Sequence, residues 1–223
     1  MTEESPIPRL AAVNRRLDQL PLADQVYKTL RDEIVDGDYV PGTHLVQEVI
    51  AGQLGVSRTP VRDALIRLSH EGLLMATGAR GFMVTEVADG LASDIYQVRE
   101  VVEPLAAALA LDKMSESDFR MLESVNHAMR SPHTPTQYYD LNRDFHLALV
   151  ERCSNLFALQ AVHLLWDQPN VRRIARSQVD HLDIPSMIKD HDEIIAAARR
   201  GDAELLKELL RRHMQVAVSS TPD

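Results

Sequence analysis

The segment from Gly55 to Leu65 constrains the fold of this 223-residue chain more than any other part of the sequence. Gly55 suits a tight turn, because glycine reaches positive φ angles without a Cβ clash. Ser57 or Thr59 can cap the helix that follows by accepting a hydrogen bond from a backbone N–H group. Pro60 then falls in the first helical turn, where its missing N–H costs little. The segment therefore predicts a sharp turn that leads directly into a helix.

Two arginines lie at the start of this predicted helix. Arg58 and Arg62 are four residues apart and therefore share one face. A helix that enters the major groove of DNA by its N-terminal end presents side chains from this part of its surface. The planar guanidinium group matches the acceptor atoms of guanine and the oxygens of phosphate. We expect Ser57, Arg58, Thr59 and Arg62 to contact double-stranded DNA.

The flanking segments complete a small domain around this helix. Apolar residues recur with a helical period in Leu22–Asp36 and again in Leu45–Leu54. Two short apolar runs, Leu73–Thr77 and Phe82–Thr85, flank a glycine-rich turn and predict a hairpin. Two helices, a DNA-reading helix and a hairpin wing together predict a winged helix-turn-helix domain over residues 21–85.

The run from Val26 to Val84 closely resembles the GntR family of bacterial transcriptional regulators. The motifs that carry this resemblance are Ile34–Gly42, Leu54–Leu65, Glu71–Leu73 and Arg80–Val84. The resemblance implies that Arg58 and Arg62 contact the major groove, and that the wing, with Arg80 and Gly81 at its tip, reaches the minor groove. Glu48 stands where some members carry a further base-reading arginine, so the second helix here is expected to support rather than to read.

The formal net charge of the chain is −9, which is unusual for a protein that binds nucleic acid. Residues 1–85 carry 9 Lys and Arg against 11 Asp and Glu, whereas residues 86–223 carry 15 against 22. Most of the negative charge therefore belongs to the second part of the chain. Because DNA affinity depends on local positive potential, the arginines between residues 56 and 85 can still support binding.

The sequence shows no sign of export or of membrane insertion. Its single cysteine, Cys153, excludes an internal disulfide, and no apolar run approaches the ~18 to 20 residues needed to span a bilayer. The first residues lack the pattern of a signal peptide. We expect a cytoplasmic protein without membrane contact, and a mobile arm over residues 1–20.

The second part of the chain is expected to be helical throughout. After a short linker at residues 86–90, residues 91–223 show helical apolar periods and no strand pattern. The predicted helices are Leu91–Met114, Ser115 to about Ser131, Gln137–Ser154, Leu156–Asp167, Val171–Gln178, Pro185–Arg200 and Asp202 to about Val218. The predicted fold class is therefore mainly α: a winged helix-turn-helix domain followed by an all-α bundle.

Three histidines and an asparagine of this bundle could meet at one point. Asn142 and His146 are four residues apart on one helix face. His191 precedes Gly201 by ten residues and His213 follows it by twelve. If the two helices form an antiparallel hairpin, both histidines lie about 15 to 18 Å from the turn and are nearly level. Such a site suits zinc, nickel, copper or iron. Alternatively, these histidines are ordinary surface or core residues.

The bundle also resembles the FCD domain of the FadR subfamily. The resemblance rests on Asn142–His146, Ser154–Asn155, His191–Asp202 and His213. It implies a divalent transition metal, most readily zinc or nickel, held by His146, His191 and His213. Asn142 stands where the family usually has an aspartate, which leaves the site more positive. The resemblance further implies a small carboxylate effector that pairs with Arg99; the alternative is a surface salt bridge from Arg99 to Glu103.

Together these features predict a homodimeric regulator, by family default a repressor, that binds operator DNA and responds to a small organic acid. Two other functions stay open at this point. A three-histidine site could serve a metal-dependent hydrolase or oxygenase, although no acidic residue stands at a defined spacing as a general base. A non-specific architectural DNA binder would have no need of an effector domain.

Overall fold

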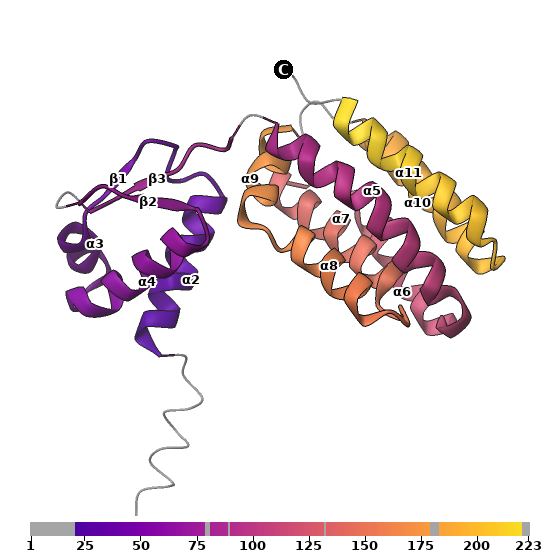
Figure 1. The fold of residues 1–223 in the computed structure, drawn as a ribbon, viewed down its shortest axis with the longest axis horizontal. Helices are drawn as coiled ribbons and strands as arrows, with labels where there is room; N and C mark the ends of the chain where they lie inside the picture. The colour runs from indigo at the N-terminus through magenta and orange to yellow at the C-terminus, as the bar shows by residue number, and fades with distance from the viewer. Residues whose placement is uncertain (1–20, 79–80, 89, 132, 179–182, 220–223) are drawn as a thin grey trace, which may run out of the picture. The chain divides into compact units, whose positions relative to one another are not determined.

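The computed structural model describes residues 21–78, 81–88, 90–131, 133–178 and 183–219. The predicted mobile arm, residues 1–20, lies outside the described residues. The chain divides into two compact units, residues 1–86 and 87–223. Each unit has its own hydrophobic core and is described by itself below; Figure 1 labels their elements.

The first unit consists of helices and a small sheet. Its helices are α2 (Leu22–Val35), α3 (Gln47–Leu54) and α4 (Arg58–His70), and its strands are β1 (His44–Leu45), β2 (Leu74–Ala76) and β3 (Phe82–Val84). The strands form an antiparallel sheet in the order β1-β3-β2. The predicted winged helix-turn-helix is therefore confirmed, with a hairpin of β2 and β3 as its wing (Figure 1).

Strand β1 is the element that the sequence did not predict. Leu45 was expected to begin the second helix, but it pairs with Phe82 in the sheet, and the helix begins at Gln47. The Leu45 side chain is buried in the core. A strand can bury a single leucine as well as a helix can, so the apolar pattern alone could not show which of the two contains Leu45.

The core of the first unit lies between α2 and α4. The side chains of Leu30, Ile34, Val61 and Leu65 are almost wholly inaccessible to solvent. At the surface, the Tyr27 hydroxyl donates a hydrogen bond to Glu71, which joins α2 to the residue that follows α4. These contacts fix the orientation of α4 within the unit.

All the regular secondary structure described in the second unit is helical. Its helices are α5 (Leu91–Ala110), α6 (Glu116–Ala128), α7 (Pro135–Val150), α8 (Leu156–Trp166), α9 (Pro169–Gln178), α10 (Ile184–Arg199) and α11 (Ala203–Ser219). A short 3₁₀ turn, Leu111–Lys113, replaces the last turn predicted for the first of these helices. The all-α prediction is confirmed, and the helix ends differ from it by a few residues.

Helix α5 is central to this bundle. It packs against α11, α8 and α7 (Figure 1). Helices α10 and α11 pack against each other around a turn in which Gly201 has a φ of 69°. Asp202 caps α11 by accepting a hydrogen bond from the backbone N–H of Leu205 at 3.1 Å. The antiparallel hairpin predicted around Gly201 is therefore present.

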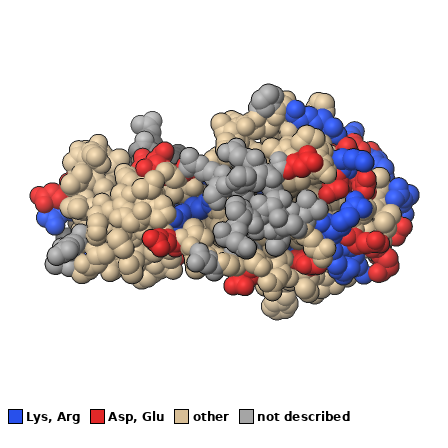
Figure 2. Space-filling view, turned by 90° about the horizontal axis from the view of Figure 1, so that it is seen from above, with Lys and Arg blue, Asp and Glu red and all other residues tan. Residues whose placement is uncertain are grey.

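Charged side chains of both signs cover the helical unit. Arg199 pairs with Glu116 and Glu123, and Arg212 pairs with Asp190 and Glu193. On the face drawn in Figure 2, blue and red side chains are interspersed over one end of this unit. Among the described helices, none combines the length and the apolar character needed to cross a bilayer.

Candidate functional site

Helix α4 presents the side chains predicted to contact DNA. Its inner face is anchored by Val61, Leu65 and Leu68, which are buried in the core. The side chains expected to read DNA are exposed; they are Ser57, Arg58, Thr59 and Arg62. Ser57 occupies the N-cap position with an extended backbone, although its side chain makes no capping hydrogen bond. Neither arginine forms an ion pair with another described residue, so both guanidinium groups are available to a partner.

A third arginine of α4 is used inside the unit. Arg67 pairs with Asp24 and lies over the ring of Tyr27, with 3.9 Å between its guanidinium carbon and the ring centroid. Its charge was counted with Arg58 and Arg62 as local positive potential. Because Asp24 largely offsets that charge, Arg67 adds less to the field of this helix than its sequence position indicates.

The structure describes one of the two wing residues that were expected to contact DNA. Arg80 lies outside the described residues. Gly81 has a φ of +99°, and a Cβ atom added there would lie 2.7 Å from the backbone oxygen of Leu45. The glycine is therefore required where β3 passes close to β1, whatever it contacts on DNA.

The three predicted histidines meet in the core of the helical unit. His146 comes from α7, His191 from α10 and His213 from α11, and all three are buried. One ring nitrogen from each lies within 4.8 Å of the others. The Nε2 atoms of His191 and His213 are 3.2 Å apart. Two nitrogens bound to one ion at ~2.1 Å and at tetrahedral to right angles would be about 3.0 to 3.4 Å apart, so this distance fits a metal centre.

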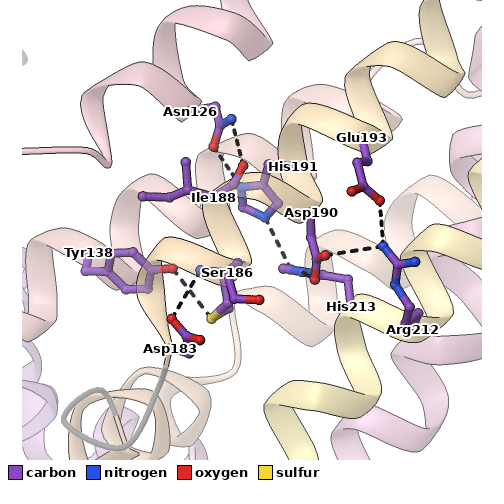
Figure 3. Close-up of polar contacts among 11 residues, drawn as sticks. Asn126, Tyr138, Asp183, Ser186, Ile188, Asp190, His191, Glu193, Arg212 and His213 are labelled. Atoms are coloured by element: carbon purple, nitrogen blue, oxygen red, sulfur yellow. Dashed lines mark hydrogen bonds and ion pairs between the residues drawn. The ribbon is translucent and has the colours of Figure 1, made fainter.

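The other nitrogen of two of these rings faces an oxygen atom, as Figure 3 shows. His191 Nδ1 lies 3.2 Å from Asn126 Oδ1, and His213 Nδ1 lies 3.4 Å from Asp190 Oδ2. In each pair the oxygen accepts if Nδ1 carries the proton. The Nε2 lone pair is then directed toward the other histidines, as a metal ligand requires.

The third histidine adjoins a buried ion pair from α5. His146 Nδ1 lies 3.0 Å from Glu103 Oε2, close but not well aligned for a hydrogen bond. The other oxygen of Glu103 accepts a hydrogen bond from Arg99 Nε at 2.5 Å. Arg99 is only 2 % exposed and lies over the ring of Trp166, 3.6 Å from its centroid. The salt bridge to Glu103, which was the alternative to an effector contact, therefore exists, but it is buried beside the histidines and not at the surface.

Asn142 meets one requirement for the fourth ligand. Its Oδ1 atom is buried and has no hydrogen-bond partner among the described residues, and the same holds for His146 Nε2. A buried acceptor without a donor costs about 1–3 kcal/mol, which a ligand would offset. The donor set, three imidazoles and one amide oxygen, suits zinc or nickel better than magnesium or calcium.

Burial also sets the protonation of the site. It lowers the pKa of His146 to about 4 and the pKa of His191 well below its usual value, so both rings are neutral at pH 7. Burial alone would raise the pKa of Glu103, but Arg99 and His146 outweigh it and lower that pKa to about 2. Because His146 is neutral, Arg99 is the partner that keeps Glu103 ionised. Neutral imidazoles are the form that binds metal.

Sequence reasoning missed four residues of this site: Glu103, Asn126, Asp190 and Trp166. Glu103 was considered only as a surface partner of Arg99, because an i,i+4 pair has the same spacing in a core as on a surface. Asp190 adjoins His191 in the sequence, yet it faces His213. Asn126 and Trp166 carry no sequence signal that links them to histidines far away in the chain.

Comparison with known proteins agrees with both units. Residues 22–84 match the family model of the bacterial regulatory proteins of the gntR family, and residues 94–216 match that of the FCD domain. The chain is 27% identical over 199 residues to the HTH-type transcriptional repressor RspR of Escherichia coli (strain K12), covering 87% of this chain and 86% of that protein.

Two further relatives extend the comparison. The uncharacterized HTH-type transcriptional regulator YdhC of Bacillus subtilis (strain 168) is 28% identical over 193 residues, covering 85% of this chain and 86% of that protein. The solved structure of E. coli McbR/YncC superposes with a TM-score of 0.68 at 25% identity, covering 90% of this chain and 97% of that one. The chain thus belongs to the GntR family of DNA-binding transcriptional regulators and carries the C-terminal FCD domain of the FadR-like subfamily.

Proposed function

We propose that this regulator is a homodimeric repressor whose affinity for operator DNA is set by a small carboxylate bound at a metal site in the helical unit. The observation that carries this proposal is the cluster of three buried histidines with ligand nitrogens within 4.8 Å of one another. We assign residues 21–85 to DNA binding, residues 86–90 to a linker, and residues 91–223 to effector binding and dimerisation. The name of RspR as a repressor supports the sign of regulation.

On the DNA side, Arg58 and Arg62 supply the base and backbone contacts from the exposed start of α4. Ser57 and Thr59 adjoin them and donate to phosphate oxygens, as short hydroxyl side chains commonly do. Arg80 and Gly81 at the wing contact the minor groove. The acidic balance of the whole chain then keeps non-specific binding weak, because its negative field opposes the attraction of the few local cations for phosphate.

In the helical unit, His146, His191, His213 and Asn142 hold a divalent metal, zinc or nickel. The bound ion supplies a positively charged position to which a carboxylate can coordinate. The asparagine is neutral, so the site keeps more positive charge than one with an aspartate and favours an anionic ligand. This accounts for the unpartnered Asn142 Oδ1 and His146 Nε2 in the core.

Arg99 is the proposed second contact of the carboxylate. Its Nε is held by Glu103, and its terminal nitrogens have no hydrogen-bond partner among the described residues. A guanidinium fixed at one edge can still offer its other edge to an anion, and charge-assisted pairs of this kind are strong and directional. The stacked Trp166 ring holds that edge in place.

The outer faces of α5 and α8 are the proposed dimer interface. Large apolar side chains are exposed along both helices; they are Val98, Val101, Leu105 and Leu109 on α5 and Leu156, Phe157 and Leu164 on α8. The two helices pack against each other, so these side chains belong to neighbouring elements. Helices with apolar residues on all sides are normally covered, and a second copy of this chain fits because operator half-sites are read by paired domains.

Effector control follows from linkage between the two sites. A carboxylate changes DNA affinity only if it binds more tightly to one arrangement of the dimer than to another. Coupling of this kind is worth about 1–3 kcal/mol, which corresponds to roughly 5- to 150-fold in operator affinity.

The metal site can be tested with the single tryptophan of the chain. The rings of Trp166 and His146 are 5.1 Å apart, so a paramagnetic ion at the histidines should quench Trp166 fluorescence. We expect saturable quenching by Ni²⁺ in the wild type, none in His213→Ala, and unchanged quenching in His127→Ala, which removes an exposed histidine of α6. The proposal fails if the wild type shows no saturable quenching or if His213→Ala behaves like the wild type.

The alternative of a metal-dependent hydrolase or oxygenase has less support. The matching families are regulatory, and the relatives described above are named as transcriptional regulators. The carboxylate nearest to the histidines, Glu103, is engaged by Arg99 and faces the Nδ1 side of His146. It is therefore poorly placed to activate water at the Nε2 side.

A further inference from the structure

Each histidine of the cluster has its own acceptor on the Nδ1 side. Asn126 is within hydrogen-bond distance of His191, and Asp190 of His213. Glu103 Oε2 lies 3.0 Å from His146 Nδ1, although the two groups are not aligned for a hydrogen bond. The three acceptors come from α6, α10 and α5. Asn126 is itself fixed, because its Nδ2 donates to Asp192 Oδ1 at 2.7 Å and to the backbone oxygen of Ile188 at 3.2 Å. Helices on several sides of the core therefore determine which ring nitrogens face the centre.

Of these three acceptors, Glu103 is the one that is both charged and fully buried. It is 1 % exposed, whereas Asp190 reaches solvent and pairs with Arg212 there. An ionised carboxylate in a core is costly unless it is paired and hydrogen-bonded. One oxygen of Glu103 meets this condition by accepting a hydrogen bond from Arg99 Nε. The other oxygen lies 3.0 Å from His146 Nδ1 without an aligned hydrogen bond, and a proton on that nitrogen, with a small rotation of the ring, would satisfy it.

We propose that Glu103 is a positioning residue of the metal site, which holds His146 with its proton on Nδ1 and its Nε2 lone pair toward His191 and His213. The inference rests on the metal site proposed above and adds a residue to it. Arg99 in turn orients Glu103, and the Trp166 ring covers the guanidinium group. A carboxylate behind a ligating imidazole fixes the tautomer of the ring and makes it a stronger ligand.

The two contacts of Glu103 explain why an amide should not replace it. A carboxylate accepts at both oxygens, so it can serve Arg99 and His146 together. A glutamine has one acceptor and one donor at its end. If its oxygen faces Arg99, its NH₂ group faces His146, which then turns its proton away from Nδ1 and loses the free Nε2 lone pair.

The test compares Glu103→Gln with Glu100→Gln. Glu100 lies three positions earlier on α5, where it accepts a hydrogen bond from Gln215 of α11 instead of facing His146. Zn²⁺ affinity would be measured by chelator competition, and the visible spectrum of the Co²⁺ form would report ligand geometry. We expect Glu103→Gln to bind Zn²⁺ roughly 10- to 100-fold more weakly, with an altered Co²⁺ spectrum, and Glu100→Gln to match the wild type.

The possible results distinguish a failure of the proposed metal site from a failure of the role proposed for Glu103. If the wild type binds no Zn²⁺, the proposed metal site itself is wrong, and this inference falls with it. If the wild type binds and Glu103→Gln binds equally well with the same Co²⁺ spectrum, only the role of Glu103 is wrong. Should Glu103→Gln fail to fold, imidazole ¹⁵N spectra of the Zn²⁺-loaded wild type decide: a protonated His146 Nδ1 supports the inference, and a metal-bound Nδ1 overturns it.

Discussion

Gly81 shows how a single position of the wing is fixed by the backbone that passes beside it. The residue combines a φ of +99° with the close approach of the Leu45 carbonyl group. Both features exclude a side chain, because the left-handed region is strained for other residues and the neighbouring atom is backbone, which cannot rotate away. The wing is therefore sensitive to substitution at Gly81 for a reason that precedes any contact with DNA.

We expect Gly81→Ala to destabilise the first unit by more than about 1 kcal/mol, since strain and a steric clash add. Thermal unfolding followed by circular dichroism would measure the loss. Gly52→Ala is the matched control: Gly52 lies in α3 with nothing within 4 Å of an added Cβ, so alanine should be neutral or slightly stabilising there. Equal effects of the two substitutions would contradict this account of the wing.

The buried histidines make stability depend on pH in a defined direction. The pKa of His146 is lowered to about 4 and that of His191 well below its usual value, so the unfolded chain binds more protons below about pH 6.5 than the folded chain does. Stability contributed by the neutral rings is present above that pH and is lost as the pH falls toward 4.

The free energy of unfolding of the metal-free protein, measured in urea, should therefore decrease as the pH is lowered from 7.5 to 4.5. Removing one buried histidine should make this free energy depend less steeply on pH, and His146→Gln is the variant to compare. His163→Gln removes a partly exposed histidine and should leave the slope unchanged. A free energy that is constant across this range in the wild type would show that the buried rings titrate normally.

At the scale of elements, the outward side of α5 is the feature that most needs a partner. Val101 on α5 is 68 % exposed and Phe157 on α8 is 83 % exposed. An Asp at either position would place a charge in the proposed dimer interface, where the loss of water is costly. We expect Val101→Asp and Phe157→Asp to shift the protein from dimer to monomer at micromolar concentration in sedimentation velocity.

Met121 on α6 offers the control for this experiment. It is also exposed, at 58 %, but lies outside the α5 and α8 faces. Met121→Asp should leave the sedimentation coefficient unchanged. A wild type that sediments as a monomer would exclude the dimer proposal, and dimeric Val101→Asp and Phe157→Asp variants would place the interface elsewhere.

Elements also show what the sequence can and cannot predict. The level placement of His191 and His213 follows from counting residues on both sides of Gly201, because a hairpin of regular helices leaves little freedom. The surroundings of Arg99 could not be predicted in the same way. Its burial depends on Trp166 from another helix, and the spacing to Glu103 is the same for an exposed pair and a buried one.

In the first unit, too, some elements could be predicted from the local sequence and others could not. Three helices and a hairpin follow from local periods and turn residues, whereas β1 depends on pairing between Leu45 and Phe82, which are distant in the sequence. The different roles of Arg62 and Arg67 on one helix have the same origin. Only the packing of α2 against α4 brings Asp24 and Tyr27 to Arg67 and leaves Arg62 exposed.

For the whole molecule, net charge and DNA binding must be reconciled. A chain of charge −9 can bind DNA only through local cations, and each phosphate contact makes the affinity fall with salt. Even two such contacts would reduce operator affinity about tenfold between 50 and 200 mM salt. Binding to a scrambled duplex should be weak throughout.

We expect Arg58→Ala and Arg62→Ala to abolish operator-specific mobility shifts while the circular dichroism spectrum stays unchanged. Arg211→Ala makes the same change in net charge on the exposed side of α11 and should bind the operator like the wild type. Normal footprints from both α4 variants would show that this helix does not read the operator. A loss shared by Arg211→Ala would show that total charge, rather than position, governs binding.

Helix α5 carries two kinds of residue on opposite sides. Arg99 and Glu103 point toward the histidines, while Val98, Val101 and Leu105 point outward. A regular helix turns as one body, so a rotation that a bound acid imposes on the inner side sweeps the outer side by the same angle. In a regulator that dimerises through that outer side, one helix would contact both the ligand and the second subunit. Rotation of α5 alone would then transmit ligand binding to the subunit interface, with no chain of intermediate residues.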